Sequence, residues 1–216
     1  MKVEIWSDVV CPWCYVGKRQ FERGLEGFEH ADAVEVTWRS YELDPRAPEV
    51  REGTYAERIA RKYGIDAGQA RAAMSRIINA GADAGIEFRF DVMRPGNTFD
   101  AHRLIHLGRS HGLGAAVKDR FLRATFREGE AIGTREALER LAVEAGLPGD
   151  EVASTLDGDA FAEDVRNDER VAQSIGVTGV PFFLIDETYA IPGAQEPSVY
   201  LTLLQRAWGE SNSADG

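Results

Sequence analysis

The two cysteines of the chain, Cys11 and Cys14, are separated by two residues and directly follow a short apolar stretch. The apolar residues up to Trp6 predict the end of a strand, and Pro12 predicts the start of a helix because proline suits the first helical position. Cys11 is then expected at the N-cap, where unpaired backbone N–H groups and the helix dipole face its sulfur. Such a position lowers the pKa of a thiol from about 8.5 to between roughly 3.5 and 7.5. The pattern therefore predicts a reactive thiolate, with Cys14 one turn further on and able to form a disulfide with it.

A second strand is predicted at residues 34–41, where apolar and polar side chains alternate. Residues 17–27, between the two strands, are expected to form a helix with Phe21, Leu25 and Phe28 on its inner face. These elements form a βαβ unit, and the two cysteines lie at its first turn.

The chain then changes character, because Pro45 and Pro48 interrupt the pattern and helical signals follow. Asn97 and Thr98 are expected to cap one of these helices, and Thr134 another. We therefore predict an inserted helical domain at residues 46–154, within a main domain formed by residues 1–45 and 155–210. The expected helices of the insertion cover residues 55–63, 67–80, 99–107, 115–128 and 135–145.

The last part of the chain restores the mixed pattern. Asp159 is expected to cap a helix that ends at Ile175, and a buried strand is predicted directly after Pro181. Residues 188–191 can pair with that strand as a hairpin. A final helix is predicted from Pro197, and residues 211–216 are predicted to be a disordered tail. The core side of this final helix is expected to contain Val199, Leu203, Leu204 and Trp208.

Strand–helix–strand followed by strand–strand–helix is the thioredoxin architecture, and four motifs resemble one family with that fold. They are Cys11-Pro12-Trp13-Cys14, Gly179-Val180-Pro181-Phe182, Gly193-Ala194-Gln195 and Asn97-Thr98-x-x-Ala101-His102-Arg103. The chain resembles the DsbA-like oxidoreductases, and most closely their FrnE-type cytoplasmic branch. This resemblance implies an α/β thioredoxin fold with a large helical insertion.

The same resemblance implies the roles of the site residues. Cys11 and Cys14 would be catalytic, with Pro12 and Trp13 shaping the site between them. Val180 and Pro181 would be joined by a cis peptide bond beside Cys11, and the backbone of Val180 would pair with an extended substrate. A contact between a ligand and the insertion, through Asn97 or Thr98, also remains possible.

Several alternative interpretations of these residues remain open. The cysteines could form a structural disulfide, but so short a loop removes little entropy from the unfolded chain. They could bind zinc together with His102 and His106, whose i,i+4 spacing suits two ligands on one helix. The cysteine and histidine pairs lie far apart in the sequence, so we expect redox chemistry, no metal, and histidines that are part of a helix face or core. Asp8, the acid nearest to Cys11, is expected to be solvated, although it could assist proton transfer to Cys14.

The predicted function is thiol–disulfide exchange with protein or small-molecule disulfides, through a mixed disulfide at Cys11. No cofactor other than the redox-active cysteine pair is expected, with glutathione as a possible co-substrate. A second possibility is a glutathione-dependent isomerase or transferase of the 2-hydroxychromene-2-carboxylate isomerase or kappa type. Members of those groups generally have serine at the position of Cys11 and lack the second cysteine. A third is a binding module or chaperone that uses the insertion and needs neither cysteine.

Composition narrows the expected partners and location. The net charge is −11, and residues 150–170 contain eight acids against two arginines, which predicts a solvated acidic face. Nucleic-acid binding is disfavoured because it needs clustered lysines and arginines. No apolar run approaches the roughly 18 residues of a membrane span, and no signal-peptide core is recognisable. We expect a cytoplasmic monomer or homodimer.

Overall fold

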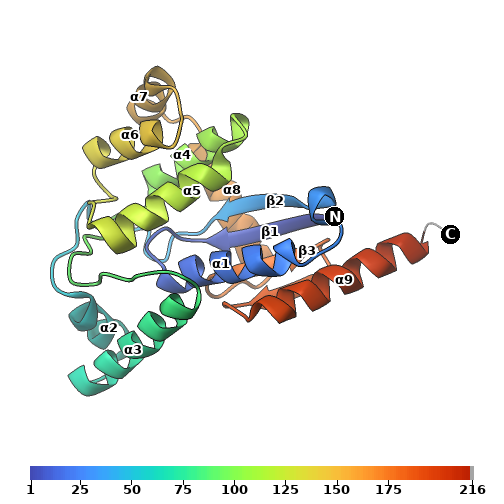
Figure 1. The fold of residues 1–216 in the computed structure, drawn as a ribbon. Coiled ribbons are helices and arrows are strands. Elements are labelled where there is room, and N and C mark those ends of the chain that lie inside the picture. Colours follow the sequence, from blue (N-terminus) through green and yellow to red (C-terminus); the bar gives the residue numbers. More distant parts are fainter. Residues whose placement is uncertain (215–216) are drawn as a thin grey trace.

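A four-stranded mixed sheet forms the centre of the protein (Figure 1), whose computed structural model describes residues 1–214 and the side chains of residues 1–211. The strand order is β2-β1-β3-β4; β1 is parallel to β2 and antiparallel to β3, and β4 is antiparallel to β3. This topology confirms the predicted thioredoxin fold. The strands are β1 (Lys2–Ser7), β2 (Glu35–Ser40), β3 (Phe182–Ile185) and β4 (Tyr189–Pro192).

Helices cover the sheet and form the insertion between β2 and β3. The helices of the main domain are α1 (Pro12–Glu26), α8 (Ala162–Ser174) and α9 (Pro197–Ala214). Those between them are α2 (Tyr55–Tyr63), α3 (Ala67–Asp83), α4 (Phe99–Ser110), α5 (Gly114–Arg123), α6 (Arg135–Glu144) and α7 (Gly149–Asp157). A short 3₁₀ helix, η1 (Ala31–Ala33), precedes β2, and a π-helical turn, η2 (Ala124–Glu128), extends α5. None of the helices among residues 1–214 is long and apolar enough to span a membrane.

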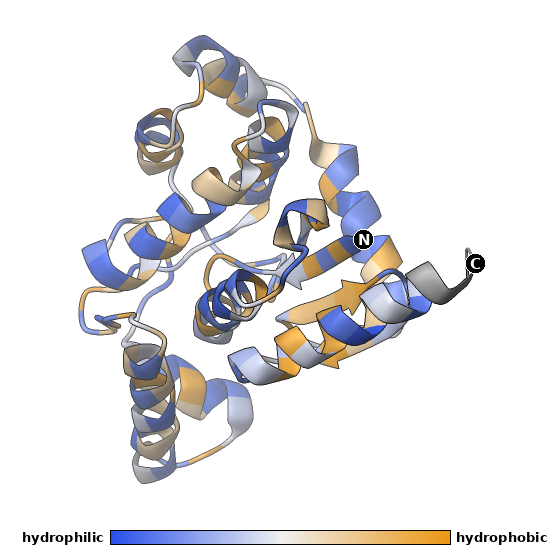
Figure 2. Ribbon diagram, turned by 45° about the vertical axis from the view of Figure 1, so that its right-hand side comes forward, coloured by the Kyte–Doolittle hydropathy of each residue, from blue (hydrophilic) through white to orange (hydrophobic). Residues whose placement is uncertain are grey.

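Buried side chains pack on both sides of the sheet, around the hydrophobic strands coloured orange in Figure 2. Successive side chains of a strand point to opposite faces. Val3 and Ile5 of β1 therefore pack into the core beneath α1 and α9, whereas Trp6 packs with Ala172 and Val177 on the α8 side. The burial of Trp6 on the second face explains why the polar–apolar alternation from Lys2 to Ile5 ends in two consecutive apolar residues, Ile5 and Trp6.

The insertion shares its core with the main domain. One cluster of buried side chains includes Ile5 of β1 and Phe21 of α1 together with Leu104 of α4, Phe121 of α5 and Leu138 of α6. The helices α2 and α3 pack instead around a second cluster that contains Tyr15 of α1. The elements nearest the two cysteines are thus held by helices from the insertion as well as by the sheet. The division at residues 46 and 154 stays a prediction.

Some expected element boundaries are wrong. The helix α7 was not predicted; the acidic side chains of its first turn, Asp150 and Glu151, suit a helix N-terminus. The helix α8 begins at Ala162, three residues after the expected cap. Tyr200 rather than the exposed Val199 fills the core side of α9. Helix α9 continues through Ala214, so residues 211–214 are not a disordered tail, and residues 215–216 lie outside the described part of the chain.

The acidic segment is also not uniformly solvated. Asp168 of α8 is 1% exposed and lies against Arg39 of β2 and His106 of α4. Neighbouring acids such as Glu163 and Asp164 are exposed as predicted. Hydrophobic periodicity cannot distinguish such a buried acid from a surface one, because its burial depends on partners from other elements.

Candidate active site

Cys11 is the N-cap residue of α1, and Pro12 occupies the first position of the helix. The Cys11 backbone is extended, and its carbonyl accepts hydrogen bonds from the N–H groups of Cys14 at 3.1 Å and Tyr15 at 3.4 Å. No side chain caps this helix end. Both cysteines are free thiols, and Cys14 is more deeply buried than Cys11. The local structure therefore confirms the predicted helix start at the cysteine pair.

The loop before β3 approaches Cys11 closely. The Val180–Pro181 peptide bond is cis, and the Cys11 thiol donates to the Val180 carbonyl oxygen over 3.5 Å. The approach requires a glycine on α1, because a Cβ at Gly17 would lie 2.9 Å from Cγ of Pro181. Residues 169 positions apart in sequence thus lie side by side at the sulfur, as the family resemblance implied.

The two thiols have opposite electrostatic environments. Hydrogen bonding from the Cys14 thiol, aided by the backbone N–H groups of Cys14 and Trp13, outweighs burial and lowers the pKa of Cys11. Burial raises the pKa of Cys14 well above its ordinary value, and the Cys11 thiolate raises it further. Cys11 is therefore the sulfur that ionises first, while Cys14 retains its proton as long as Cys11 is a thiolate.

Three buried titratable side chains come from the end of β1 and from two helices of the insertion. Asp8 follows β1, His102 belongs to α4 and Lys118 to α5; each is at most 1% exposed. The Lys118 ammonium donates to the Ser7 carbonyl over 3.1 Å. Burial lowers the pKa of Lys118 to about 8, against the opposing effect of Cys14, Asp8 and Cys11. The expectation of a solvated Asp8 is therefore wrong.

Lys118 was missed by the sequence interpretation, although a signal was present. It precedes Phe121 and Leu122 by three and four residues, so it lies on the apolar face of the predicted helix. A lysine on such a face is either paired or functional. Its contact with the Ser7 carbonyl depends on the tertiary packing of α5, because the two residues lie far apart in the sequence.

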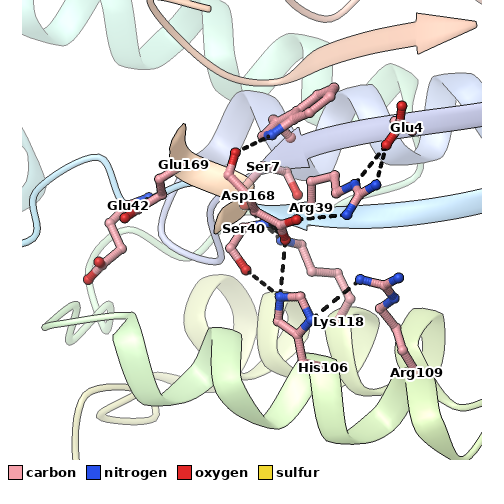
Figure 3. A network of polar contacts seen from close by, with 11 residues as sticks. Glu4, Ser7, Arg39, Ser40, Glu42, His106, Arg109, Lys118, Asp168 and Glu169 are labelled. Atoms are coloured by element: carbon pink, nitrogen blue, oxygen red, sulfur yellow. Dashed lines mark hydrogen bonds and ion pairs between the residues drawn. The ribbon is translucent and has the colours of Figure 1, made fainter. Parts of the chain in front are cut away.

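His106 belongs to a second polar network one helical turn beyond His102 (Figure 3). Its Nε2 lies 3.0 Å from Asp168 Oδ2 and 3.1 Å from Ser40 Oγ. Asp168 also accepts from the Ser40 N–H at 2.8 Å and pairs with Arg39 at 2.9 Å. His102 also faces a buried aspartate, because its Nε2 lies 3.5 Å from Asp8 Oδ1. Among residues 1–214 with described side chains, no three His, Cys, Asp or Glu groups are arranged to hold a metal ion.

The remaining predicted site residues differ in their solvent exposure and in their contacts. Trp13 is exposed beside Cys11, whereas Pro12 is buried. The Asn97 side chain caps α4 by accepting from the Phe99 N–H at 2.9 Å, so Asn97 rather than Thr98 supplies the cap. Its amide also donates to the Pro45 carbonyl at 3.2 Å. Neither Asn97 nor Thr98 has a described contact with a cysteine, and Thr98 is buried. A contact of either residue with a ligand stays a prediction.

Glu42 is a buried acid whose protonation state changes near neutral pH. It is buried in the loop after β2, where Arg166 pairs with one carboxylate oxygen. Burial raises its pKa to about 7, with Arg166 opposing the shift and Glu169 adding to it. The charge of Asp8 acts in the same direction as that of Glu169.

The raised pKa of Glu42 predicts a pH-dependent stability. Between its ordinary value of 4.5 and about 7, the folded protein retains a proton that the unfolded chain has lost, so the free energy of unfolding falls as pH rises through this window. Glu42→Gln should remove this loss. The free energy of unfolding of the variant relative to wild type should therefore be higher at about pH 8 than at about pH 5, by on the order of 2 kcal/mol. Urea unfolding of both proteins at the two pH values measures this difference. The exposed Glu52→Gln serves as the control, and an equal gain there would contradict the assignment.

A groove of about 650 Å³ lies away from the cysteines, along the edge strand β2. Trp38 of β2 lines it together with His106 and Arg109 of α4. Neither cysteine contributes to its wall. The candidate active site is therefore located by its chemistry rather than by cavity size.

The sequence and the fold of this chain are similar to those of several known proteins. Residues 2–205 match the family model of the DSBA-like thioredoxin domain. The chain is 43% identical to a Streptomyces coelicolor protein described as a probable DsbA oxidoreductase, over 97% of this chain and 91% of that one, with a TM-score of 0.92. It is 18% identical to the cytosolic disulfide reductase DsbM of Pseudomonas aeruginosa, solved with GSH, over 95% of this chain and 98% of that one, with a TM-score of 0.68. YwbO, an uncharacterised protein of Bacillus subtilis, is 29% identical over 201 residues, 92% of each chain.

Proposed function

The chain belongs to the DSBA-like thioredoxin domain family, and we propose that it is a thiol–disulfide oxidoreductase that acts through a mixed disulfide at Cys11. One observation supports this most directly. The sulfur of lowered pKa lies at a helix N-terminus, against the Val180 carbonyl and one turn from a buried thiol of raised pKa. This arrangement supplies an attacking thiolate and a second sulfur that resolves its product.

In the reducing direction, the Cys11 thiolate attacks one sulfur of a substrate disulfide, and the other sulfur leaves as a thiolate. The Cys14 thiolate then attacks Cys11 Sγ, forms the Cys11–Cys14 disulfide and releases the second substrate thiolate. Oxidation of a substrate dithiol is the same sequence reversed. We propose net reduction or isomerisation, because a cytoplasm whose glutathione pool is strongly reducing sustains those directions more easily than net oxidation.

The substrate segment is proposed to bind beside Val180. Among the described residues, the Val180 N–H has no hydrogen-bond partner, and the exposed Trp13 lies next to the attacking sulfur. An extended peptide or glutathione can pair with that backbone while its sulfur faces Cys11. DsbM is described as a cytosolic enzyme, and its structure was solved with GSH. We extend both properties to this chain as proposals, together with membership of the FrnE-type branch and the absence of a cofactor beyond the cysteine pair.

A mixed-disulfide trap tests the function. Cys14→Ser removes the resolving thiol but preserves Cys11, so the variant should accumulate covalent adducts with oxidised glutathione or with a protein disulfide, visible as a mass increase that dithiothreitol reverses. The wild-type protein should form the same adduct only transiently. If Cys14→Ser formed no adduct while its Cys11 remained reactive toward an alkylating agent, disulfide exchange would be excluded. Saturable glutathione binding without an adduct would favour the isomerase or transferase alternative.

A further inference from the structure

The outer edge of β2 pairs with no other strand among the described residues. β2 is the first strand in the order β2-β1-β3-β4, so only its inner edge is paired, with β1 (Figure 1). On that inner edge the Glu35 N–H donates to the Met1 carbonyl at 3.0 Å. Because the backbone groups of successive strand residues point to opposite edges, the N–H and C=O groups of Val36 and Trp38 point away from β1. These groups have no hydrogen-bond partner in the described part of the chain.

Two contacts limit the free edge to these two residues. At one end, the Ser40 N–H also points away from β1, but it donates to Asp168 Oδ2 at 2.8 Å. At the other end, the Val34 N–H donates to the Ala31 carbonyl at 3.0 Å. Backbone groups without a protein partner need hydrogen bonds from water or from a ligand. A short extended segment laid along this edge would supply such bonds to both free residues.

The free edge is part of the wall of the groove of about 650 Å³ along β2. Phe21 of α1 and Phe161 at the start of α8 line the groove, and Ser110 of α4 and Ala115 of α5 complete it. Since α1 and α8 lie on opposite faces of the sheet, the groove continues the plane of the sheet beyond β2. The edge is therefore recessed between helices. A second copy of this chain presents the same recessed edge, so two copies cannot pair through it, whereas a single extended segment can enter.

On the α1 side, the groove is apolar. The side chains of Val36 and Trp38 belong to the same hydrophobic cluster as Phe21 and Leu25 of α1, and all four residues line the groove. A strand added beside β2 would place every second side chain on this face. Apolar side chains at those positions would bury their surface against α1.

On the α8 side, the groove is acidic. Glu35, whose side chain points to the opposite face from that of Val36, and Asp164 of α8 both line it. Both acids are exposed, and neither forms an ion pair with a described side chain. A third carboxylate of the wall, Glu22, already pairs with Lys18, and the wall includes one arginine, Arg109. The alternate side chains of an added strand would therefore be complementary to the groove if they were basic.

We propose that the free edge of β2 docks an extended segment of a partner protein in which apolar side chains alternate with lysine or arginine. The segment joins the sheet as an additional strand and exchanges backbone hydrogen bonds with Val36 and Trp38. Its apolar side chains pack against α1, and its basic side chains face Glu35 and Asp164. Neither cysteine contributes to the wall of this groove, so the docking site is independent of the proposed redox function.

Two N-methylated peptides test the backbone bonds. A short peptide that alternates lysine and valine is titrated into the full-length protein, and binding is measured by calorimetry. N-methylation removes the amide donors of the valines in one variant and of the lysines in the other. Only one set faces β2: the valine amides if the added strand is antiparallel, the lysine amides if it is parallel. We expect the variant methylated on that set to bind roughly tenfold more weakly than the other. Equal affinities of the two variants, or no binding of the unmodified peptide, would overturn the proposal.

Substitutions in the protein test the acidic wall. Glu35→Lys combined with Asp164→Lys should weaken binding of the lysine–valine peptide roughly tenfold at low ionic strength and much less at high salt. Glu52→Lys, at an exposed acid outside the groove wall, should bind like wild type. Unchanged affinity in the double variant, or equally tight binding of a glutamate–valine peptide, would overturn the proposal.

A proline at the edge tests the docking position. Val36→Pro removes a donor that points away from β1, and proline is tolerated at such an edge position. The variant should keep the circular dichroism spectrum of wild type and bind the peptide more weakly. Sedimentation of the free protein tests the other occupant: self-association that Val36→Pro abolishes would assign the edge to a second copy and overturn the proposed partner segment.

Discussion

Replacing Cys11 with serine is expected to reduce the rate of thiol-dependent insulin reduction to that of the reductant alone. The thiolate, not the thiol, is the nucleophile, and the helix N-terminus together with Cys14 favours that ionised form only at position 11. A serine hydroxyl does not ionise at neutral pH and cannot form the mixed disulfide. Turbidity of precipitating insulin chains, with dithiothreitol or glutathione as the reductant, measures the rate.

Cys14→Ser is the matched control for this substitution. It leaves the attacking sulfur in place, so before any reductant is added it should form one equivalent of mixed disulfide, which Cys11→Ser should not form. With reductant present, wild type resolves this intermediate through Cys14, whereas Cys14→Ser depends on the added thiol for release. Full insulin-reducing activity in Cys11→Ser would eliminate the disulfide mechanism, and activity in the absence of both cysteines would favour a binding module or chaperone.

Replacing Asp168 with alanine is expected to lower the free energy of unfolding by about 3–5 kcal/mol, as removal of one partner from a buried ionic network does. The carboxylate accepts from the Ser40 N–H and pairs with Arg39 and His106 (Figure 3). Alanine would leave the Ser40 N–H and His106 buried without this acceptor, and Arg39 would keep only Glu4 as its carboxylate partner. Guanidinium unfolding followed by circular dichroism measures the change.

Asp164→Ala is the control on the same helix. Asp164 is exposed on α8, so its replacement should alter the free energy of unfolding by less than about 0.5 kcal/mol. Burial raises the pKa of Asp168, but His106, the Ser40 N–H and Arg39 outweigh it and lower the pKa below 3.8. Its stabilising contribution is therefore present above that value and disappears as pH falls below it. If the difference in free energy of unfolding between wild type and Asp168→Ala stayed the same at low pH, the ionised Asp168 carboxylate would not be its source.

Local signals accounted for most of the fold. The alternation in residues 34–41 predicted β2, and Thr134 predicted the start of α6, which its side chain caps by accepting from the Ala137 N–H. Helix α2 was predicted with its observed bounds from the spacing of its apolar residues and the stop at Gly64, which adopts the left-handed conformation; the structure adds a capping box at Thr54. Boundaries failed where such signals were weak, as at the start of α8, where Phe161 rather than a capping side chain occupies the N-cap position.

The site could be predicted only in part, for a related reason. Cys11, Pro12 and Cys14 lie within one helical turn, so their spacing in the sequence already determines their geometry. The approach of Val180 and Pro181 was expected from the family resemblance and not from spacing. Asp8 was expected to be solvated, and His102 to be part of a helix face or core. Burial of a polar side chain depends on residues distant in the sequence, and these two residues are 94 positions apart.

The sequence by itself determined a thiol pair at the start of a helix and the order of strands and helices around it, because these depend on side-chain periodicity and local capping. Tertiary structure alone decided what surrounds the second sulfur. It brought Lys118 of α5 against Ser7 and His102 of α4 against Asp8, and it removed Asp8 from solvent. Charges interact strongly only when several elements together exclude water from around them, and no single segment of the chain encodes that exclusion.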